Sequence, residues 1–287
     1  MLTKTKRTHL LQRVLLYLAV VVIIIWTTAP YLWLIISSLS YRIDLLQVPL
    51  HWIPPRITLD NYYELFVSGG QTNANATLFL QALRNSGIIT FSATFICLVL
   101  GVLAAYALAR LKFPGSGVYL ALMMTVQMVP PVAIVIPLYV ILRNFNMLDT
   151  RYGLVLVYLS FILPLVVWLM RSYFAAIPSE LEDAARIDGC SRLGALMRVI
   201  LPLSGPGLVS VAVFAFIAAW NEYLYAFILT TVDAKTLPVL IGEFSTKLGL
   251  EYLRIAAAGV LASLPPVILA LIFQRFIIRG LTAGSIK

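Results

Sequence analysis

Long apolar runs separated by shorter polar segments dominate the chain. Each run is close to the roughly 20 residues that a helix needs to cross about 30 Å of hydrocarbon. The runs occupy residues 14–39, 85–109, 118–142, 152–174, 208–230 and 254–277. The segments between them are too short for a separate soluble domain. The pattern predicts one all-α membrane domain over residues 14–277, with polar ends at 1–13 and 278–287.

Charged residues and prolines add orientation and shape to these runs. Positive residues favour the cytoplasmic side of a membrane, and they precede the first run at 4–7 and follow the second at Arg110 and Lys112. The sequence therefore predicts six spans with both termini in the cytoplasm. Pro130 and Pro131 predict a kink or break in the third run, because proline removes a helical hydrogen bond.

The polar segments on the opposite side are expected to be loops. They cover residues 41–83, 143–151 and 231–251, and all three would face the exterior. Arg84 and Asn85 are expected to anchor the start of the second run at the membrane interface. We expect the fifth run, 208–230, to be one continuous span.

Composition agrees with a membrane protein and narrows its chemistry. The 287 residues are 61% hydrophobic and 11% charged, whereas soluble domains carry about 25% charged residues. The net charge of +9 does not indicate nucleic-acid binding, because the cations lie at the ends of apolar runs. The chain has no phosphate-binding GxxxxGKS or GxxxxGKT loop and no metal-ligand spacing. We therefore expect no cofactor bound by this chain and no catalytic residues.

One polar stretch, residues 178–203, lies between the fourth and fifth runs. Ser179 precedes Glu182 by three residues, which is the spacing of a capping box at a helix start. Acidic residues in the first turn also suit the positive end of the helix dipole. Gly189 predicts a sharp turn, because glycine tolerates positive φ. A second helix is expected over 191–200.

The first of these two helices would present one small and nearly flat face. Helical spacing places Leu181, Ala184, Ala185 and Asp188 on that face. Two interpretations are open: an amphipathic loop that rests on the bilayer, or a helix that docks against another protein. Interfacial helices favour bulky apolar faces and basic polar faces, so alanines and acids suit a protein partner better.

The spacing inside this stretch resembles the signature loop of ABC importer permeases. That loop is usually written Glu-Ala-Ala, three residues, Gly, nine residues, Ile-x-Leu-Pro. Here Asp183-Ala184-Ala185, Gly189 and Val199-Ile200-Leu201-Pro202 follow the same spacing, with Asp in place of Glu and Val in place of the first Ile. Further segments resemble the sugar-importing branch and its maltose-type second permease; they are 105–115, 219–223 and 279–287.

The resemblance implies a type I ABC importer permease fold, with its core over about 84–277 and a coupling loop over 178–203 that docks on a cytoplasmic ATPase. Either Asp183 or Glu182 would supply the anchoring charge. The implied coupling residues are Glu182, Asp183, Ala184, Ala185, Asp188 and Gly189. The implied contacts of the tail with the ATPase are Gly280, Leu281, Thr282, Ala283 and Gly284.

The same resemblance implies a set of partners. The chain would pair with a second permease subunit as a heterodimer, above two ATPase subunits that bind ATP and Mg²⁺. An extracytoplasmic binding protein would deliver a sugar, which the resemblance does not specify further. The whole assembly would lie in the cytoplasmic membrane of a bacterium or archaeon, and the chain itself would be a transporter subunit and not an enzyme.

A few polar residues inside the apolar runs are candidates for the translocation path. They are Gln127, Asn221, Glu222 and Tyr223. A carboxylate near the middle of a membrane costs roughly 2.5–3.5 kcal/mol on insertion scales, so Glu222 must face protein or water. It would either line the path or make a structural contact between helices, and Gln127 would either line the path or serve a packing kink. The alternative function is an ion-coupled secondary transporter that uses Glu222, which leaves the loop 178–203 unexplained.

Overall fold

The computed structural model describes residues 2–45, 47, 52–67, 73–111, 113–244 and 252–283. Within these ranges the regular secondary structure is entirely helical, which confirms the predicted all-α class. The chain divides into two compact units, which are described separately. The first comprises residues 1–76 and 241–262, and the second comprises 77–240 and 263–287.

Several helices are long and apolar enough to cross a bilayer. Four candidates among the described residues are single helices: α1 (Leu2–Ser38), α4 (Asn73–Arg110), α7 (Arg151–Ala176) and α14 (Tyr252–Ala283). Two further candidates among the described residues are bent pairs. The helix α5 (Ser116–Val126) meets α6 (Pro131–Asn144) at 95°, and the segment Arg192–Leu203 meets α11 (Gly205–Trp220) at 82°. The predicted number of six spans is reached when each bent pair counts as one.

One break between helices was predicted from the sequence, and another was not. The predicted break at Pro130 and Pro131 is confirmed, because α5 ends at Val126 and α6 begins at Pro131. The predicted continuous span 208–230 is wrong, because α11 stops at Trp220 and α12 (Leu224–Leu229) begins only after a short gap.

The start of α4 also differs from the prediction. The helix begins at Asn73, so its first turns occupy part of the expected loop 41–83. Phe79 and Ala82 in these turns are buried, and this packing keeps the polar segment helical. Asn85 is fully buried and is not an interface anchor, because its amide donates to the carbonyl oxygens of Asp233 (2.8 Å) and Lys235 (2.9 Å).

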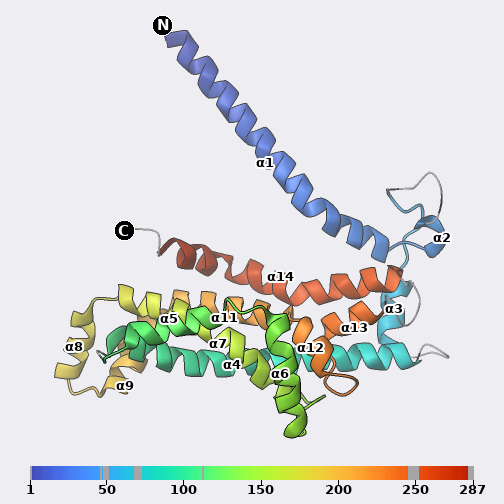
Figure 1. Ribbon diagram of the computed structural model, residues 1–287. Coiled ribbons are helices and arrows are strands. Elements are labelled where there is room, and N and C mark those ends of the chain that lie inside the picture. Colours follow the sequence, from blue (N-terminus) through green and yellow to red (C-terminus); the bar gives the residue numbers. More distant parts are fainter. Residues whose placement is uncertain are drawn as a thin grey trace. The chain divides into compact units, whose positions relative to one another are not determined.

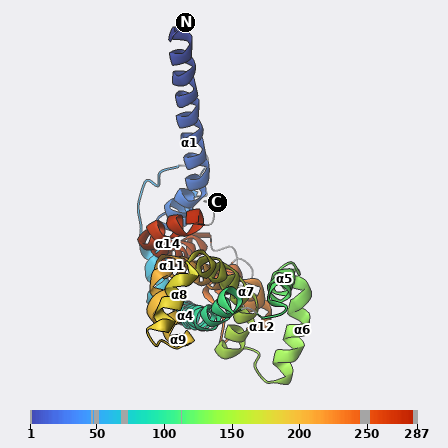
Figure 2. The same ribbon diagram turned by 90° about the vertical axis from the view of Figure 1, so that its left-hand side faces the viewer.

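In the second unit, α4, α7 and α11 run side by side, with α8 (Ser179–Ile187) and α9 (Arg192–Ala195) at one end (Figure 1). Figure 2 shows α5 and α6 on the side of α7. The core lies along α7, where Tyr158, Ile162 and Met170 are buried. A close approach of α11 to α7 is possible because residue 207 is glycine; a Cβ there would lie 2.6 Å from the ring of Tyr173.

In the first unit, the end of α1 is held by short helices that follow it. These are α2 (Arg42–Leu45) and α3 (Asp60–Phe66). The Asn61 amide donates to the carbonyl oxygens of Ser38 (2.9 Å) and Ser40 (3.0 Å). Glu64 pairs with Arg254 of α14 at 2.7 Å. A further helix, α13 (Leu237–Phe244), lies in the expected loop 231–251.

Candidate functional site

The helix α8 begins directly after Pro178, and the way it begins differs from the prediction. No side chain caps its first turn, so the predicted capping box of Ser179 and Glu182 is wrong. Glu182 instead points back toward α4. The Tyr106 hydroxyl donates to its Oε1 at 2.5 Å, and the Nε of Arg110 lies 3.5 Å from its Oε2. A buried cation and a buried hydroxyl together stabilise a carboxylate more than a single amide of the first helical turn does. Water can satisfy that amide instead.

Arg110 also contacts the end of α7. One of its terminal nitrogens donates to the carbonyl oxygens of Phe174 (2.8 Å) and Ile177 (2.6 Å). Carbonyl groups at a helix C-terminus have no partner within the helix, and a cation there also suits the negative end of the dipole. Arg110 therefore joins the ends of α4 and α7 to Glu182 on α8. Both side chains of the ion pair are only 10% exposed.

The anchoring of Glu182 decides which face of α8 is free. Glu182 and Ala185, three residues apart, are both buried. Asp183, Ala184 and Asp188 are exposed on the remaining surface. The predicted flat face included Ala185, and that part of the prediction is wrong because Ala185 is buried together with Glu182. Oδ1 of the exposed Asp183 lies 4.0 Å from a guanidinium nitrogen of Arg186. Both side chains are well solvated, so this ion pair does not fix the position of Asp183.

The turn after α8 agrees with the prediction, but the second helix is more complex than expected. Gly189 has a φ of +90°, which confirms the predicted glycine turn. The Ser191 hydroxyl caps α9 by accepting from the amide of Gly194 (3.1 Å). The chain continues as a π-helix, η2 (Leu196–Ile200), and as α10 (Leu201–Leu203). The predicted end at residue 200 is therefore wrong, because the helical backbone continues from η2 through Pro202 to Leu203.

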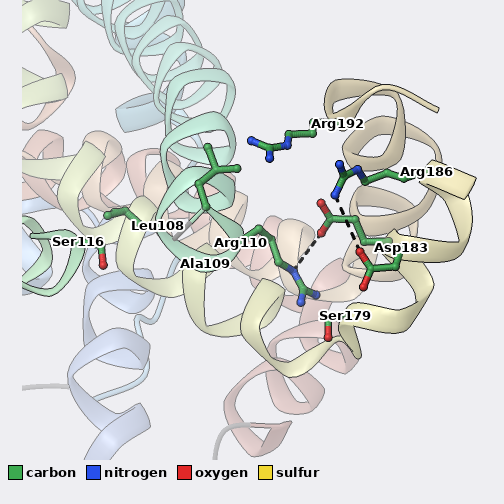
Figure 3. Close-up of a pocket in the computed structure, with 10 residues that line it drawn as sticks. Leu108, Ala109, Arg110, Ser116, Ser179, Asp183, Arg186 and Arg192 are labelled. Atoms are coloured by element: carbon green, nitrogen blue, oxygen red, sulfur yellow. Dashed lines mark ion pairs between the residues drawn. The ribbon is translucent and has the colours of Figure 1, made fainter. Parts of the chain in front are cut away.

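A cavity of about 770 Å³ lies between the end of α4, the start of α5 and α8 (Figure 3). Its polar wall includes arginines and two of the acids of α8, Glu182 and Asp183. Figure 3 shows Arg110 and Arg186 pointing toward these two acids. The cavity is lined by Leu108, Ala109, Arg110, Leu111, Ser116, Ser179, Glu182, Asp183, Arg186 and Arg192. The free face of α8 and this polar cavity together form the candidate coupling site.

The four candidates for the translocation path lie at the two helix breaks. The Glu222 carboxylate accepts hydrogen bonds from the amides of Tyr225 (2.8 Å) and Ala226 (3.1 Å), so it satisfies the free start of α12. Its neighbours Asn221 and Tyr223 are exposed. Buried or lipid-facing backbone amides need such partners, which gives Glu222 a structural role.

Gln127 lies at the other break, between α5 and α6. Its amide donates to the carbonyl oxygen of Phe161 at 2.6 Å, although the residue is exposed. The Phe161 ring stacks on Tyr225, with ring centroids 5.6 Å apart. The two breaks are therefore connected through one aromatic pair, which no sequence pattern indicated.

The predicted tail contacts are only partly within the described residues. Residues 280–283 form the last turn of α14, and Gly284 lies outside the described part of the chain.

A polar cluster at the opposite end of α4 from the candidate coupling site was not predicted. The Asp149 carboxylate accepts hydrogen bonds from four amides of residues 231–234 and from the Thr231 hydroxyl, at 2.7–3.1 Å. Burial raises the pKa of the Asp149 carboxyl, but the bonds from the Ala234 amide and the Thr231 hydroxyl outweigh it and hold the pKa well below its usual range. We name residue 149 with residues 231–234 the carboxylate clasp.

Comparison with known proteins identifies the family. Residues 97–283 match the family described as binding-protein-dependent transport system inner membrane component. The chain belongs to this family. Its members are named as transport proteins, so the chain is a transporter subunit and not an enzyme, and the match places it among multi-pass proteins of the inner membrane.

Two curated relatives cover nearly the whole chain. The trehalose transport system permease protein SugB of Mycobacterium tuberculosis is 39% identical over 261 residues, which are 90% of this chain and 92% of the relative. The trehalose/maltose transport system permease protein MalG of Thermococcus litoralis is 35% identical over 284 residues, which are 98% of this chain and 99% of the relative.

Solved structures agree with this fold. A chain of a bacterial ABC transporter for import of the acidic polysaccharide alginate superposes with a TM-score of 0.75 at 22% identity, over 91% of this chain and 95% of that one. A chain of the MetNI methionine ABC transporter gives a TM-score of 0.56 at 18% identity, over 71% of this chain and 97% of that one. The predicted ABC importer permease fold is confirmed.

Proposed function

We propose that this protein is the permease subunit of an ATP-driven carbohydrate importer and that α8 couples it to an ATPase. One observation carries the coupling role: α8 is anchored from behind through Glu182 and presents Asp183, Ala184 and Asp188 to the surroundings. An anchored helix with a small, acidic and exposed face can fit closely into a cleft and pair with a cation there. Asp183, and not the buried Glu182, would supply the anchoring charge toward the ATPase.

The carbohydrate class is supported by the names of relatives. These name trehalose, maltose, diacetylchitobiose and arabinooligosaccharides as transported compounds of the respective proteins. Their permeases align with this chain over at least 90% of its length. We extend the shared class, but none of these particular sugars, to this chain.

The proposed assembly pairs this chain with a second permease subunit above two ATPase subunits. The ATPase subunits would bind ATP and Mg²⁺, and an extracytoplasmic binding protein would deliver the sugar. Both termini and the loop 178–203 would lie in the cytoplasm of a bacterium or archaeon, with the residues 280–284 near the ATPase. The ion-coupled alternative has no support from the family, and its key residue Glu222 already binds backbone amides.

Reconstitution tests this proposal. The chain would be co-expressed with the permease, ATPase and binding-protein genes that neighbour its own, and the complex would be placed in proteoliposomes. We expect ATP-dependent uptake of at least one radiolabelled sugar from a panel that includes trehalose and maltose. Charge reversal in Asp183→Arg should abolish co-purification of the ATPase. The control Asp233→Arg, which changes an exposed side chain of the carboxylate clasp, should not.

Two outcomes would contradict the proposal. One is failure of the ATPase subunits to co-purify with the unaltered chain. The other is sugar uptake that needs a proton gradient and proceeds without ATP, which would favour the ion-coupled alternative.

A further inference from the structure

The end of α4 carries two polar side chains that both reach α8. Tyr106 and Arg110 are four residues apart, so they lie on the same face of the helix. The Tyr106 hydroxyl and the Arg110 guanidinium hold different oxygens of one carboxylate, that of Glu182. We call Tyr106, Arg110 and Glu182 the coupling joint.

The coupling joint connects four helices: α4, α7, α8 and α9. The same Arg110 that pairs with Glu182 also binds the carbonyl oxygens of Phe174 and Ile177, at the end of α7. The Tyr106 hydroxyl lies 3.4 Å from the carbonyl oxygen of Arg192 at the start of α9. A displacement of α8 therefore acts on α4 through the ion pair of Glu182 with Arg110 and the hydrogen bond from Tyr106. It acts on α7 through the hydrogen bonds that Arg110 donates there.

Burial strengthens these contacts and makes the loss of any one partner costly. Tyr106 and Glu182 are less than 10% exposed, and water competes little for their hydrogen bonds. Removing one partner of such a pair leaves a buried charge without compensation. α8 also contacts η2 and α9 and buries the small Ala185, but these packing contacts are less directional than the hydrogen bond and the ion pair of Glu182.

We propose that the coupling joint is a positioning device that transmits movement of α8 to α4 and α7, and that Glu182, Arg110 and Tyr106 are positioning residues for energy coupling. This inference rests on the proposed docking of α8 on an ATPase. It assigns different tasks to two adjacent acids: Asp183 binds the partner, and Glu182 carries the movement into the membrane helices.

The test needs a reporter that does not depend on the transported sugar. Cys97 and Cys190 are the cysteines of the chain, and both would be replaced by serine. A single cysteine would then be introduced at the exposed helix break by Asn221→Cys. The rate at which a maleimide labels this cysteine would be measured in the reconstituted complex, with and without ATP and vanadate, together with ATP hydrolysis.

In the complex with an intact joint, we expect ATP and vanadate to change the labelling rate by about fivefold or more, the lower bound of typical coupling between sites. In Glu182→Ala, the ATPase subunits should remain bound and hydrolyse ATP, but the labelling rate should change less than about twofold. Glu182→Gln, which still accepts from Tyr106 but has no charge, should give an intermediate response. The control Glu180→Ala, which removes an exposed acid of the same helix, should respond like the intact complex.

Tyr106→Phe is a second test variant, which removes only the hydroxyl group from the coupling joint. It replaces Glu182→Ala if that variant does not reach the membrane. It should reduce the ATP response while leaving ATP hydrolysis in place. A full response in both Glu182→Ala and Tyr106→Phe would overturn the inference. If the complex with an intact joint neither binds the ATPase nor responds to ATP, the proposed function itself is contradicted.

Discussion

The carboxylate clasp provides a prediction whose size follows from the structure. Oδ1 of Asp149 accepts from the amides of Thr231 and Ala234, and Oδ2 accepts from the Thr231 hydroxyl and from the amides of Val232 and Asp233. The substitution Asp149→Asn keeps one acceptor oxygen and turns the other position into a donor. At least two hydrogen bonds to a charged acceptor are lost, and an NH₂ group then faces N–H donors.

Hydrogen bonds to charged groups contribute about 1.5–3 kcal/mol each. Two lost bonds would give about 3–6 kcal/mol, and the partial exposure of Asp149 reduces this to about 2–3 kcal/mol because water competes. At 1.4 kcal/mol per factor of ten, the amides of residues 231–234 should exchange about 30 to 140 times faster. Hydrogen exchange with mass spectrometry on a peptide covering this loop measures local opening of this kind.

A control substitution and the pH dependence of protection test the same prediction. Asp233→Asn removes a charge from the same loop, but its side chain is exposed, so exchange should stay as in the unaltered chain. The pKa of Asp149 is lowered in the folded protein, so its stabilisation is complete above the unfolded value of about 3.9 and is lost only as the pH falls through the folded value. Protection, corrected for intrinsic exchange, should be constant from pH 8 to about 5. Exchange in Asp149→Asn that stays within about threefold of the unaltered chain would refute the reasoning.

Three further substitutions test other parts of the structure. Gly207→Ala places a Cβ 2.6 Å from the Tyr173 ring and should lower the free energy of unfolding by about 1–3 kcal/mol, because it overpacks α11 on α7. Tryptophan fluorescence during heating should show a lower unfolding temperature. An unchanged unfolding temperature would contradict the close approach of the two helices. Gly189→Ala forces a φ of +90° on alanine and should weaken ATPase binding at a cost of about 1–3 kcal/mol, whereas Gly189→Asn should be milder; equal binding by both variants counts against a strained turn. Glu222→Ala removes the acceptor at the start of α12 and should speed amide exchange at Tyr225 by about tenfold or more. Sugar uptake that falls in Glu222→Ala beyond the loss of folded protein would instead indicate a role in the path.

The sequence alone indicated where the long apolar helices lie, although α4 begins before its predicted start and the predicted fifth span is broken after Trp220. Hydrocarbon cannot satisfy backbone hydrogen bonds, so long apolar runs must be helical and must be about as long as the membrane is thick. The break at Pro130 and Pro131 and the turn at Gly189 were also predictable, because each depends on the conformational limits of one residue type. The motif spacing in residues 178–203 identified the candidate coupling site for the same reason, since it is local in the chain.

The tertiary structure decided where the polar side chains point. A capping box was the best local partner for Glu182, but Tyr106 lies 76 residues earlier in the chain and binds the carboxylate instead. Asn85 became a buried contact in the same way, because the carbonyl group of Asp233 lies 148 residues away.

Sequence spacing ranks only partners within a few residues, and a buried polar group takes the strongest partner that folding brings to it. Folding thus divided the two adjacent acids of α8. Glu182 is held inside by the coupling joint, and Asp183 remains exposed on the surface of α8.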